Sequence, residues 1–229
     1  MLFLEDSYLK EFEAEVINIE NNNIILNQTA FYAKSGGQPG DAGNLIINND
    51  EIEIVDTIYN SEKKIMHICE DVKNIKIGEK IIGKIDWKKR YKYMKMHTAL
   101  HLLCSLIKYD VTGGQITSEK SRLDFNSDSK INKEEINLKI NKLIEEDHHI
   151  SYEWITNEDL DKKPELIRTM SVKPPRNNYK IRLVKIGNID LQPCGGTHVK
   201  STNEIGNIII GKIENKGKMN KRVNILIND

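Results

Sequence analysis

The chain has 229 residues, enough for one large domain or two small ones that each bury a hydrophobic core. Its 34 lysines and arginines balance 34 aspartates and glutamates, so the overall charge gives no reason to expect a polyanionic partner. Three cysteines at unrelated spacings argue against a disulfide framework, and no stretch of about 18 apolar residues is present to span a membrane.

The amino-terminal segment carries charges at Glu5 and Asp6, where a signal peptide would need an uninterrupted apolar core. Free thiols also persist more readily in a reducing compartment than in secreted proteins. We therefore expect the protein to be cytoplasmic and to have no contact with a membrane.

Residues 11–86 predict a small antiparallel β-barrel or sandwich. Short apolar runs alternate with turn-forming segments such as NNN, SGGQPGDAG and NSEKK, and no helix of ordinary length fits between them. The longest of these segments lies in a glycine-rich loop, TAFYAKSGGQPGDAG, at 29–43. Its glycines allow backbone N–H groups to approach a ligand closely. A plain hairpin connection is the alternative, and a phosphate loop is excluded because no Gly-Lys-Ser/Thr ending and no helix follow.

The apolar residues repeat with helical spacing from Asp86 onward. The predicted stripe consists of Tyr93, Met96, Leu100, Leu103 and Ile107. A second helix is expected at about 132–147, where Asn132 and Glu135 resemble a capping box. Further strands are expected at 121–126, 150–155, 180–187, 205–213 and 222–227.

This change of pattern predicts a domain boundary near Trp87. Residues 1–86 would form a small amino-terminal antiparallel β-barrel domain that carries the glycine-rich loop. Residues 87–229 would form an α/β domain with an antiparallel sheet and helices. The expected fold class is therefore α+β.

The segment 84–95 concentrates positive charge at the predicted domain junction. It holds six basic side chains against Asp86, with aromatic residues between them. Such a segment could present a basic face to phosphates, and an ordinary solvated surface is the alternative.

Two pairs of residues have the chemistry of metal ligands. His97 and His101 lie four residues apart on the predicted helix and so project from the same face. Cys194 and His198 flank a Gly-Gly-Thr segment that can turn tightly. Imidazole and thiolate are the ligands that zinc prefers, so we predict one Zn²⁺ site from the four residues. Four protein ligands are typical of a structural zinc, whereas a set with one cysteine is poor in sulfur for that role, so both a structural and a catalytic role stay open.

Other histidines and cysteines are weaker candidates. His148 and His149 are adjacent and cannot share one face, which predicts surface histidines. His67 and Cys69 alternate on a predicted strand and are interpreted as packing residues. Cys104 lies on the apolar side of the first helix, as a small core residue would.

Four segments together resemble one known family. The glycine-rich loop, HTALHLL, QPCGGTHV and the tail EIGNIIIGKIENKGKMNKRV are similar, in this order, to the editing region of alanyl-tRNA synthetase. The spacing most resembles the free-standing alanyl-tRNA editing proteins called AlaX, in their longer form with an amino-terminal barrel domain. The resemblance runs from about Leu26 to the end of the chain.

The resemblance implies roles for particular residues. Thr29 would recognise the serine hydroxyl of a mischarged aminoacyl group, and Gly36, Gly37 and Gln38 would close over the site. Lys34 stands where the family motif usually has glutamate. The zinc of the deacylation centre would be held by His97, His101, Cys194 and His198.

The implied activity is hydrolysis of the ester in seryl-tRNA(Ala), and in some members of glycyl-tRNA(Ala). Neither ATP nor aminoacylation is expected, and the partner would be tRNA(Ala) mischarged with serine. Two alternatives belong to other classes: a zinc-stabilised RNA-binding module without catalysis, and a zinc hydrolase of small esters.

Overall fold

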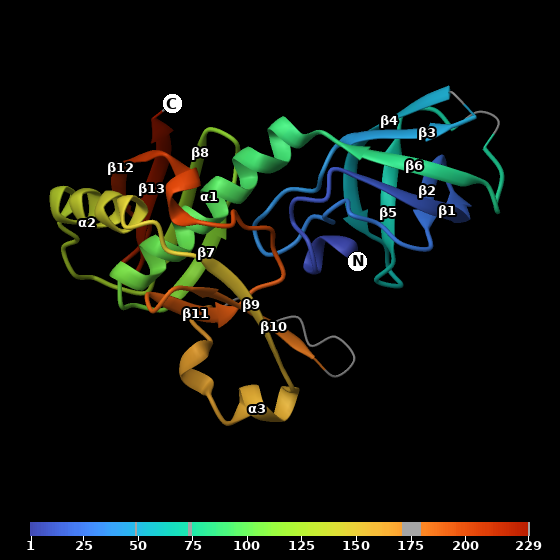
Figure 1. Cartoon of the computed structure of the whole chain (residues 1–229). Helices are drawn as coiled ribbons and strands as arrows, with labels where there is room; N and C mark the ends of the chain where they lie inside the picture. Colours follow the sequence, from blue (N-terminus) through green and yellow to red (C-terminus); the bar gives the residue numbers. More distant parts are fainter. Residues whose placement is uncertain (49, 73–74, 171–179, 229) are drawn as a thin grey trace. The chain divides into compact units, whose positions relative to one another are not determined.

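The computed structural model describes residues 1–48, 50–72, 75–170 and 180–228. The chain divides into two compact units, Met1–Tyr91 and Lys92–Asp229. Antiparallel sheets and a few helices make up the described chain, so the expected α+β class is confirmed (Figure 1). No helix within the described part of the chain is long and apolar enough to cross a membrane.

Six strands of the first unit close into an antiparallel barrel, in the order β1-β2-β5-β4-β3-β6 (Figure 1). Their bounds are Glu11–Glu20 (β1), Asn23–Leu26 (β2), Gly43–Ile47 (β3), Asp50–Tyr59 (β4), Ile65–Cys69 (β5) and Lys80–Ile85 (β6). The pairing of β6 with both β1 and β3 completes the ring. The prediction of a barrel or sandwich is therefore resolved in favour of the barrel, which leaves no open sheet edge among these strands.

The barrel interior follows from strict alternation along its strands. In β6 every second residue is buried, and the first six residues of β1 alternate in the same way. Since successive side chains of a strand point to opposite faces, the buried set forms one continuous core. Its members include Phe12, Phe31, Ile24, Leu45 and Ile54.

The glycine-rich loop connects β2 to β3 and is tied down by Arg90, which lies in the first turn of α1 (Trp87–Leu106). The Arg90 guanidinium is fully buried and pairs with the Asp41 carboxylate through Nε and Nη2. It also donates to the carbonyl groups of Ser7 at 3.0 Å and Ala30 at 2.6 Å. Arg90 is therefore not available to the basic face considered for residues 84–95.

Helix α1 begins where the sequence predicts. The Asp86 side chain accepts the backbone N–H of Lys89 at 3.1 Å, as an N-cap does. All five residues of the predicted apolar stripe are buried, and so are Met94, Ala99 and Leu102 on other sides. From about residue 93, α1 is therefore a core helix rather than a surface helix with one apolar face.

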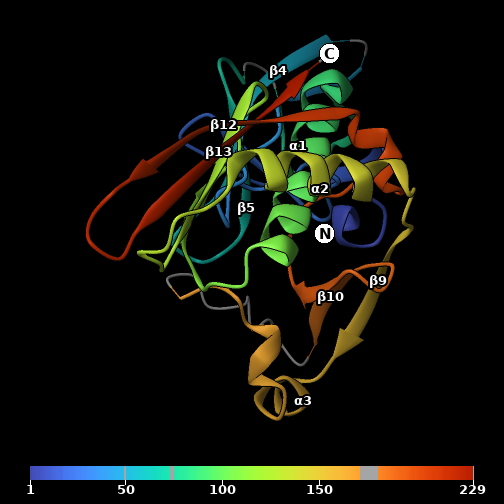
Figure 2. The ribbon, with the colours of Figure 1, turned by 90° about the vertical axis from the view of Figure 1, so that its left-hand side faces the viewer.

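Within its described residues, the second unit contains two antiparallel sheets. One has the order β12-β13-β8-β7, with α1 and α2 on the same face of it (Figures 1 and 2). The other has the order β11-β10-β9. The bounds are Val111–Gln115 (β7), Lys120–Phe125 (β8), Ile150–Ile155 (β9), Ile181–Ile186 (β10), Asp190–Pro193 (β11), Asn207–Asn215 (β12), Lys221–Asn228 (β13), Lys133–Glu145 (α2) and Asn157–Asp161 (α3). Short 3-10 turns occupy Leu2–Leu4, Pro164–Leu166 and Thr202–Ile205.

The predicted elements of this unit are present, with small shifts at their ends. Asn132 caps α2 by accepting the N–H of Glu135 at 3.3 Å, as expected. Strands β7 and β11 and helix α3 were not predicted, because they are short and both strands contain glycine or proline.

Helix α2 satisfies polar groups on the edge strand β12. Asn141 exchanges two hydrogen bonds with the backbone of Ile208, at 2.9 and 2.8 Å. Asn137, one turn earlier, accepts the N–H of Ile210 at 2.8 Å. The helix thereby occupies backbone groups that an uncovered edge would offer to another chain.

We expect Arg90→Met to lower the free energy of unfolding by about 3–5 kcal/mol, because it leaves the buried Asp41 carboxylate without its cation. Urea denaturation followed by circular dichroism measures the change. The matched control is Lys139→Met, which breaks an exposed ion pair with Glu135 and should cost about 0.5 kcal/mol or less. Equal losses in both variants would contradict the role of the buried pair.

Candidate metal centre

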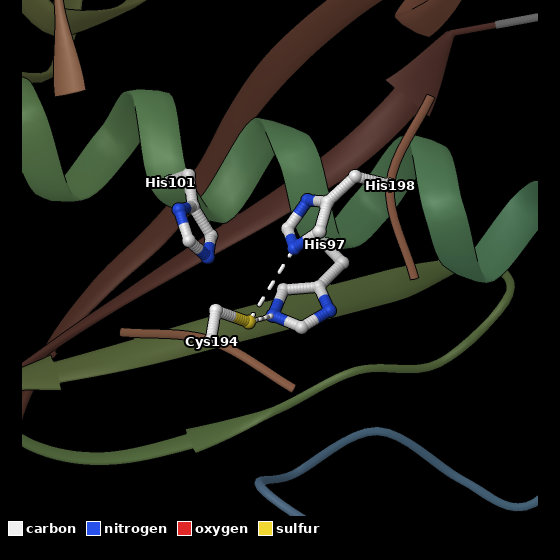
Figure 3. A group of neighbouring side chains, drawn as sticks. All are labelled: His97, His101, Cys194 and His198. Carbon is white, nitrogen blue, oxygen red and sulfur yellow. Dashed lines mark hydrogen bonds between the residues drawn. The ribbon is translucent and has the colours of Figure 1, made fainter. Parts of the chain in front are cut away.

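Four side chains converge in the second unit (Figure 3). His97 and His101 project from one side of α1, Cys194 directly follows β11, and His198 lies four residues further along. One ligand atom from each lies within 4.8 Å of the others. The structure thus brings together all four residues of the predicted ligand set, and the group could hold a metal ion.

The distances within this group fit a tetrahedral ion. Cys194 Sγ lies 3.5 Å from Nε2 of His97 and 3.4 Å from Nε2 of His198. Bond lengths of about 2.0 Å to nitrogen and 2.3 Å to sulfur place two ligands of a tetrahedral zinc about 3.5 Å apart. Both sulfur-to-nitrogen distances therefore have the length expected when one tetrahedral ion lies between the ligands.

Thr98 orients the His198 ring. Its hydroxyl donates to the carbonyl of Met94 at 2.9 Å, which uses its only proton. The same oxygen lies 3.1 Å from Nδ1 of His198, so Nδ1 must be the donor. The lone pair of this imidazole is therefore on Nε2, the atom that faces Cys194.

His101 is held by a carboxylate from β11. Its Nδ1 lies 3.0 Å from Oδ2 of Asp190, and Gln192 Nε2 donates to the same oxygen at 2.7 Å. A carboxylate on the outer nitrogen of a ligating histidine fixes the ring and leaves Nε2 for the metal. Asp190 and Gln192 were not among the sequence candidates. Asp190 and Gln192 lie four and two residues before Cys194, and residues two apart on a strand share a face. This spacing was the signal that could have identified them.

The loop that carries Cys194 is organised by Arg182 of β10. This side chain is 4% exposed, and its Nε donates to the Cys194 carbonyl at 2.9 Å, while its Nη2 donates to the Gly196 carbonyl. The N–H of Gly196 in turn points at the Cys194 sulfur, at 3.4 Å. The turn therefore presents an amide donor to the sulfur, which favours the thiolate form.

Electrostatics at the site also favour the thiolate. Burial raises the pKa of Cys194, but the neighbouring His97 and His198 outweigh it and hold that pKa well below its ordinary value. Burial and the His97 charge hold the pKa of His198 well below its ordinary value. At His101 burial lowers the pKa, but the hydrogen bonds to Asp190 and Cys194 outweigh it and raise it to about 10. Metal binding through this ring would therefore release a proton.

The other predicted site residues, Thr29, Gly36, Gly37 and Gln38, belong to the first unit. Gly36 and Gly37 have φ values of 54° and 84°, and Ser35 and Gln38 exchange backbone hydrogen bonds of 3.1 and 2.8 Å around them. Two central residues with positive φ are the signature of a type I′ hairpin turn, which explains the glycine pair. Gln38 is buried, whereas Lys34 and both turn glycines are exposed.

The rest of this loop is packed closely onto the barrel. A Cβ atom at Gly40 would lie 2.1 Å from the backbone oxygen of Thr57, so only glycine fits there. The loop is therefore packed against the barrel and is not a loose connection between β2 and β3.

Thr29 is engaged inside the barrel. Its Oγ1 lies 2.9 Å from Nε2 of His67 and accepts the N–H of Phe31 at 3.0 Å. His67 and Cys69 are both buried, as expected of packing residues, and the contact of His67 with Thr29 was not foreseen. His149 is exposed, as predicted for the surface histidines, and His148 is partly buried beside Glu146.

Comparison with known proteins identifies two family models along the chain. One, described as tRNA synthetases class II (A), matches residues 4–89. The other, described as threonyl and alanyl tRNA synthetase second additional domain, matches residues 181–224 and so includes Cys194 and His198.

Individual relatives extend this similarity to nearly the whole chain. The alanyl-tRNA editing protein AlaX-M of Saccharolobus solfataricus is 38% identical over 227 residues, which cover 97% of this chain and 96% of the relative. AlaX-M of Methanosarcina acetivorans is 35% identical over 237 residues, with coverage of 97% and 96%. An alanine–tRNA ligase of Pyrococcus abyssi is 34% identical over 93% of this chain, which corresponds to 24% of the ligase.

We expect Cys194→Ala to lose the bound metal, because removal of the thiolate leaves an incomplete ligand set. The metal-to-protein ratio, measured by mass spectrometry after purification, should fall from about one to near zero. Cys104→Ala is the matched control, since Cys104 is a buried cysteine of α1 outside the group and its variant should retain the ion. Retention of the ion by the Cys194 variant would contradict the assignment.

A pH dependence of stability follows from His67. Burial lowers its pKa from 6.5 to about 4, so between these values the unfolded chain binds a proton that the folded chain does not. The free energy of unfolding should therefore fall as the pH drops from 6.5 to 4, by up to about 1.4 kcal/mol per pH unit from this group. Urea denaturation at several pH values measures the slope. His67→Phe should flatten it, and an unchanged slope would be evidence against this attribution.

Proposed function

The chain belongs to the AlaX family of alanyl-tRNA editing proteins, and on this basis we propose that it is a zinc-dependent deacylase of tRNA(Ala) mischarged with serine. The reaction would consume one water molecule and break the ester bond between the seryl carbonyl carbon and the terminal ribose oxygen. Its products would be free serine and a tRNA with its terminal hydroxyl restored. The convergence of His97, His101, Cys194 and His198 is the observation that carries this proposal.

Zinc is the metal best suited to this ligand set. Three imidazoles and one thiolate combine the nitrogen and sulfur ligands that it prefers, and the sulfur-to-nitrogen distances near 3.5 Å suit its tetrahedral geometry. When bound, such an ion supplies a Lewis acid that can polarise a carbonyl group or lower the pKa of water. Asp190 and Thr98 hold two of the imidazoles in the orientation that ligation needs.

Selection of serine is proposed to rest on Thr29. A buried hydroxyl oxygen with one lone pair for the serine hydroxyl would keep that lone pair without a donor when alanine enters. Sites built to hydrogen-bond a substrate hydroxyl reject analogues without it by several orders of magnitude. Cognate alanyl-tRNA(Ala) would thereby escape hydrolysis.

The segment around the start of α1 suits a nucleic acid. Lys84 and Lys88 are exposed, and Trp87 stacks on Tyr91 with ring centroids 5.3 Å apart. Lys10 adds a cation 4.6 Å from the Trp87 ring. Exposed cations beside stacked aromatic rings favour contacts with phosphates and bases, and we propose that this surface meets the acceptor stem.

A zinc-stabilised RNA-binding module without catalysis is the second candidate. The specific observation in its favour is the number of protein ligands, because four of them are typical of a structural zinc site. This candidate predicts binding of tRNA(Ala) without turnover, whereas a hydrolase of small esters would act on free aminoacyl esters.

One assay separates these functions. The purified protein is incubated with seryl-tRNA(Ala), alanyl-tRNA(Ala) and a free seryl ester, each with and without a zinc chelator. We expect hydrolysis of seryl-tRNA(Ala) at a rate at least about 100-fold above that of alanyl-tRNA(Ala), and its loss on chelation. Binding of tRNA(Ala) without turnover would support the RNA-binding module. Turnover of the free seryl ester would support the hydrolase of small esters. Activity that survives complete removal of zinc would refute the metal dependence.

A further inference from the structure

His67 is a buried histidine outside the metal group. It lies on β5 with no exposed surface, and its ring meets the edge of Phe31 at a centroid distance of 5.3 Å. Each ring nitrogen contacts one polar atom: Nδ1 lies 2.9 Å from the carbonyl of Ile24, and Nε2 lies 2.9 Å from Oγ1 of Thr29. Both ring nitrogens of His67 therefore have a hydrogen-bond partner.

These partners determine the tautomer of His67. A carbonyl oxygen can only accept, so Nδ1 must carry the proton that points at Ile24. Burial keeps the ring neutral near pH 7, because it lowers the pKa of His67 to about 4. A neutral imidazole has one N–H, and Nε2 therefore carries a lone pair.

The tautomer in turn determines what the Thr29 hydroxyl can do. Since Nε2 of His67 can only accept, Thr29 must donate its single proton to that atom. The backbone N–H of Phe31 already occupies one of the two lone pairs of Oγ1. Among the residues that the structure describes, no other donor meets Oγ1, so one lone pair is left and the hydroxyl can accept one more hydrogen bond and can donate none.

We propose that His67 is a positioning residue that makes Thr29 an obligate hydrogen-bond acceptor, so that the site takes aminoacyl groups whose side chain donates a hydrogen bond. This inference rests on the proposed function, in which Thr29 meets the aminoacyl side chain. A seryl group carries the donor, whereas alanyl and glycyl groups do not.

Kinetics on four variants test this role: Thr29→Val, His67→Phe, His67→Gln and the double variant Thr29→Val/His67→Phe. The readout is the ratio of kcat/KM for seryl-tRNA(Ala) to that for alanyl-tRNA(Ala). His67→Phe keeps the ring shape but removes the acceptor, and it should lower the ratio about tenfold or more because the Thr29 hydroxyl is free to turn. His67→Gln offers an amide oxygen to the hydroxyl and should restore part of the ratio.

The double variant separates positioning from mere support of the fold. If His67 acts through the Thr29 hydroxyl, His67→Phe should change the ratio less than about twofold once Thr29 is valine. If His67 only supports the fold, His67→Phe should lower kcat/KM for both tRNAs together. It should do so with either threonine or valine at position 29. Thermal melting of each variant reports any loss of folded protein.

The tautomer can be checked in the wild-type protein alone. Long-range proton–nitrogen correlation spectra of zinc-bound protein labelled with ¹⁵N-histidine should show His67 protonated at Nδ1 and unprotonated at Nε2. The opposite tautomer would overturn the inference even if the His67 variants fail to fold.

The outcomes distinguish this inference from the function on which it rests. A wild-type protein that does not hydrolyse seryl-tRNA(Ala) refutes the proposed function, whatever the tautomer. A wild type that selects serine, together with a His67→Phe variant of unchanged ratio, refutes the positioning role alone.

Discussion

The buried ion pair between Arg90 and Asp41 is the interaction on which the first unit depends. Two charges are taken out of water here, and this is tolerable only because hydrogen bonds satisfy the remaining atoms. Asp41 also accepts the N–H of Tyr32 at 2.6 Å, and Arg90 donates to the carbonyls of Ser7 and Ala30. One guanidinium thus joins the amino-terminal segment, both sides of the glycine-rich loop and the first turn of α1.

The candidate sites share one feature. In each, a backbone carbonyl, which can only accept a hydrogen bond, gives a hydroxyl or an imidazole a single orientation. The Met94 carbonyl orients Thr98, which in turn orients His198. The Ile24 carbonyl does the same for His67. Buried polar groups with only one satisfied arrangement are rigid, and rigidity is what ligation and selective recognition both require.

The metal group shows why such orientation matters. Four polar side chains lie together in a largely buried group. Their loss of water costs free energy unless another interaction replaces it. A bound cation would compensate for it and would link the stability of the second unit to metal binding. The protonation pattern, with a thiolate at Cys194 and a proton to release at His101, is consistent with that link.

Local periodicity and composition were enough to predict several features of this protein. Alternating apolar residues predicted the barrel strands, helical spacing predicted that His97 and His101 share one face, and the order of four motifs identified the family. The roles of Thr29 and of the glycine turn stay predictions that rest on this resemblance.

Contacts between side chains that are distant along the chain could not be predicted in this way. Arg90 looked like a surface cation, and it is buried because Asp41, far away in sequence, lies within its reach. Asp190 and His67 were likewise missed as partners of His101 and Thr29. The physical reason is that backbone geometry dictates which neighbours along the chain share a face, whereas hydrogen bonds between distant segments form only once packing has brought their atoms within about 3 Å.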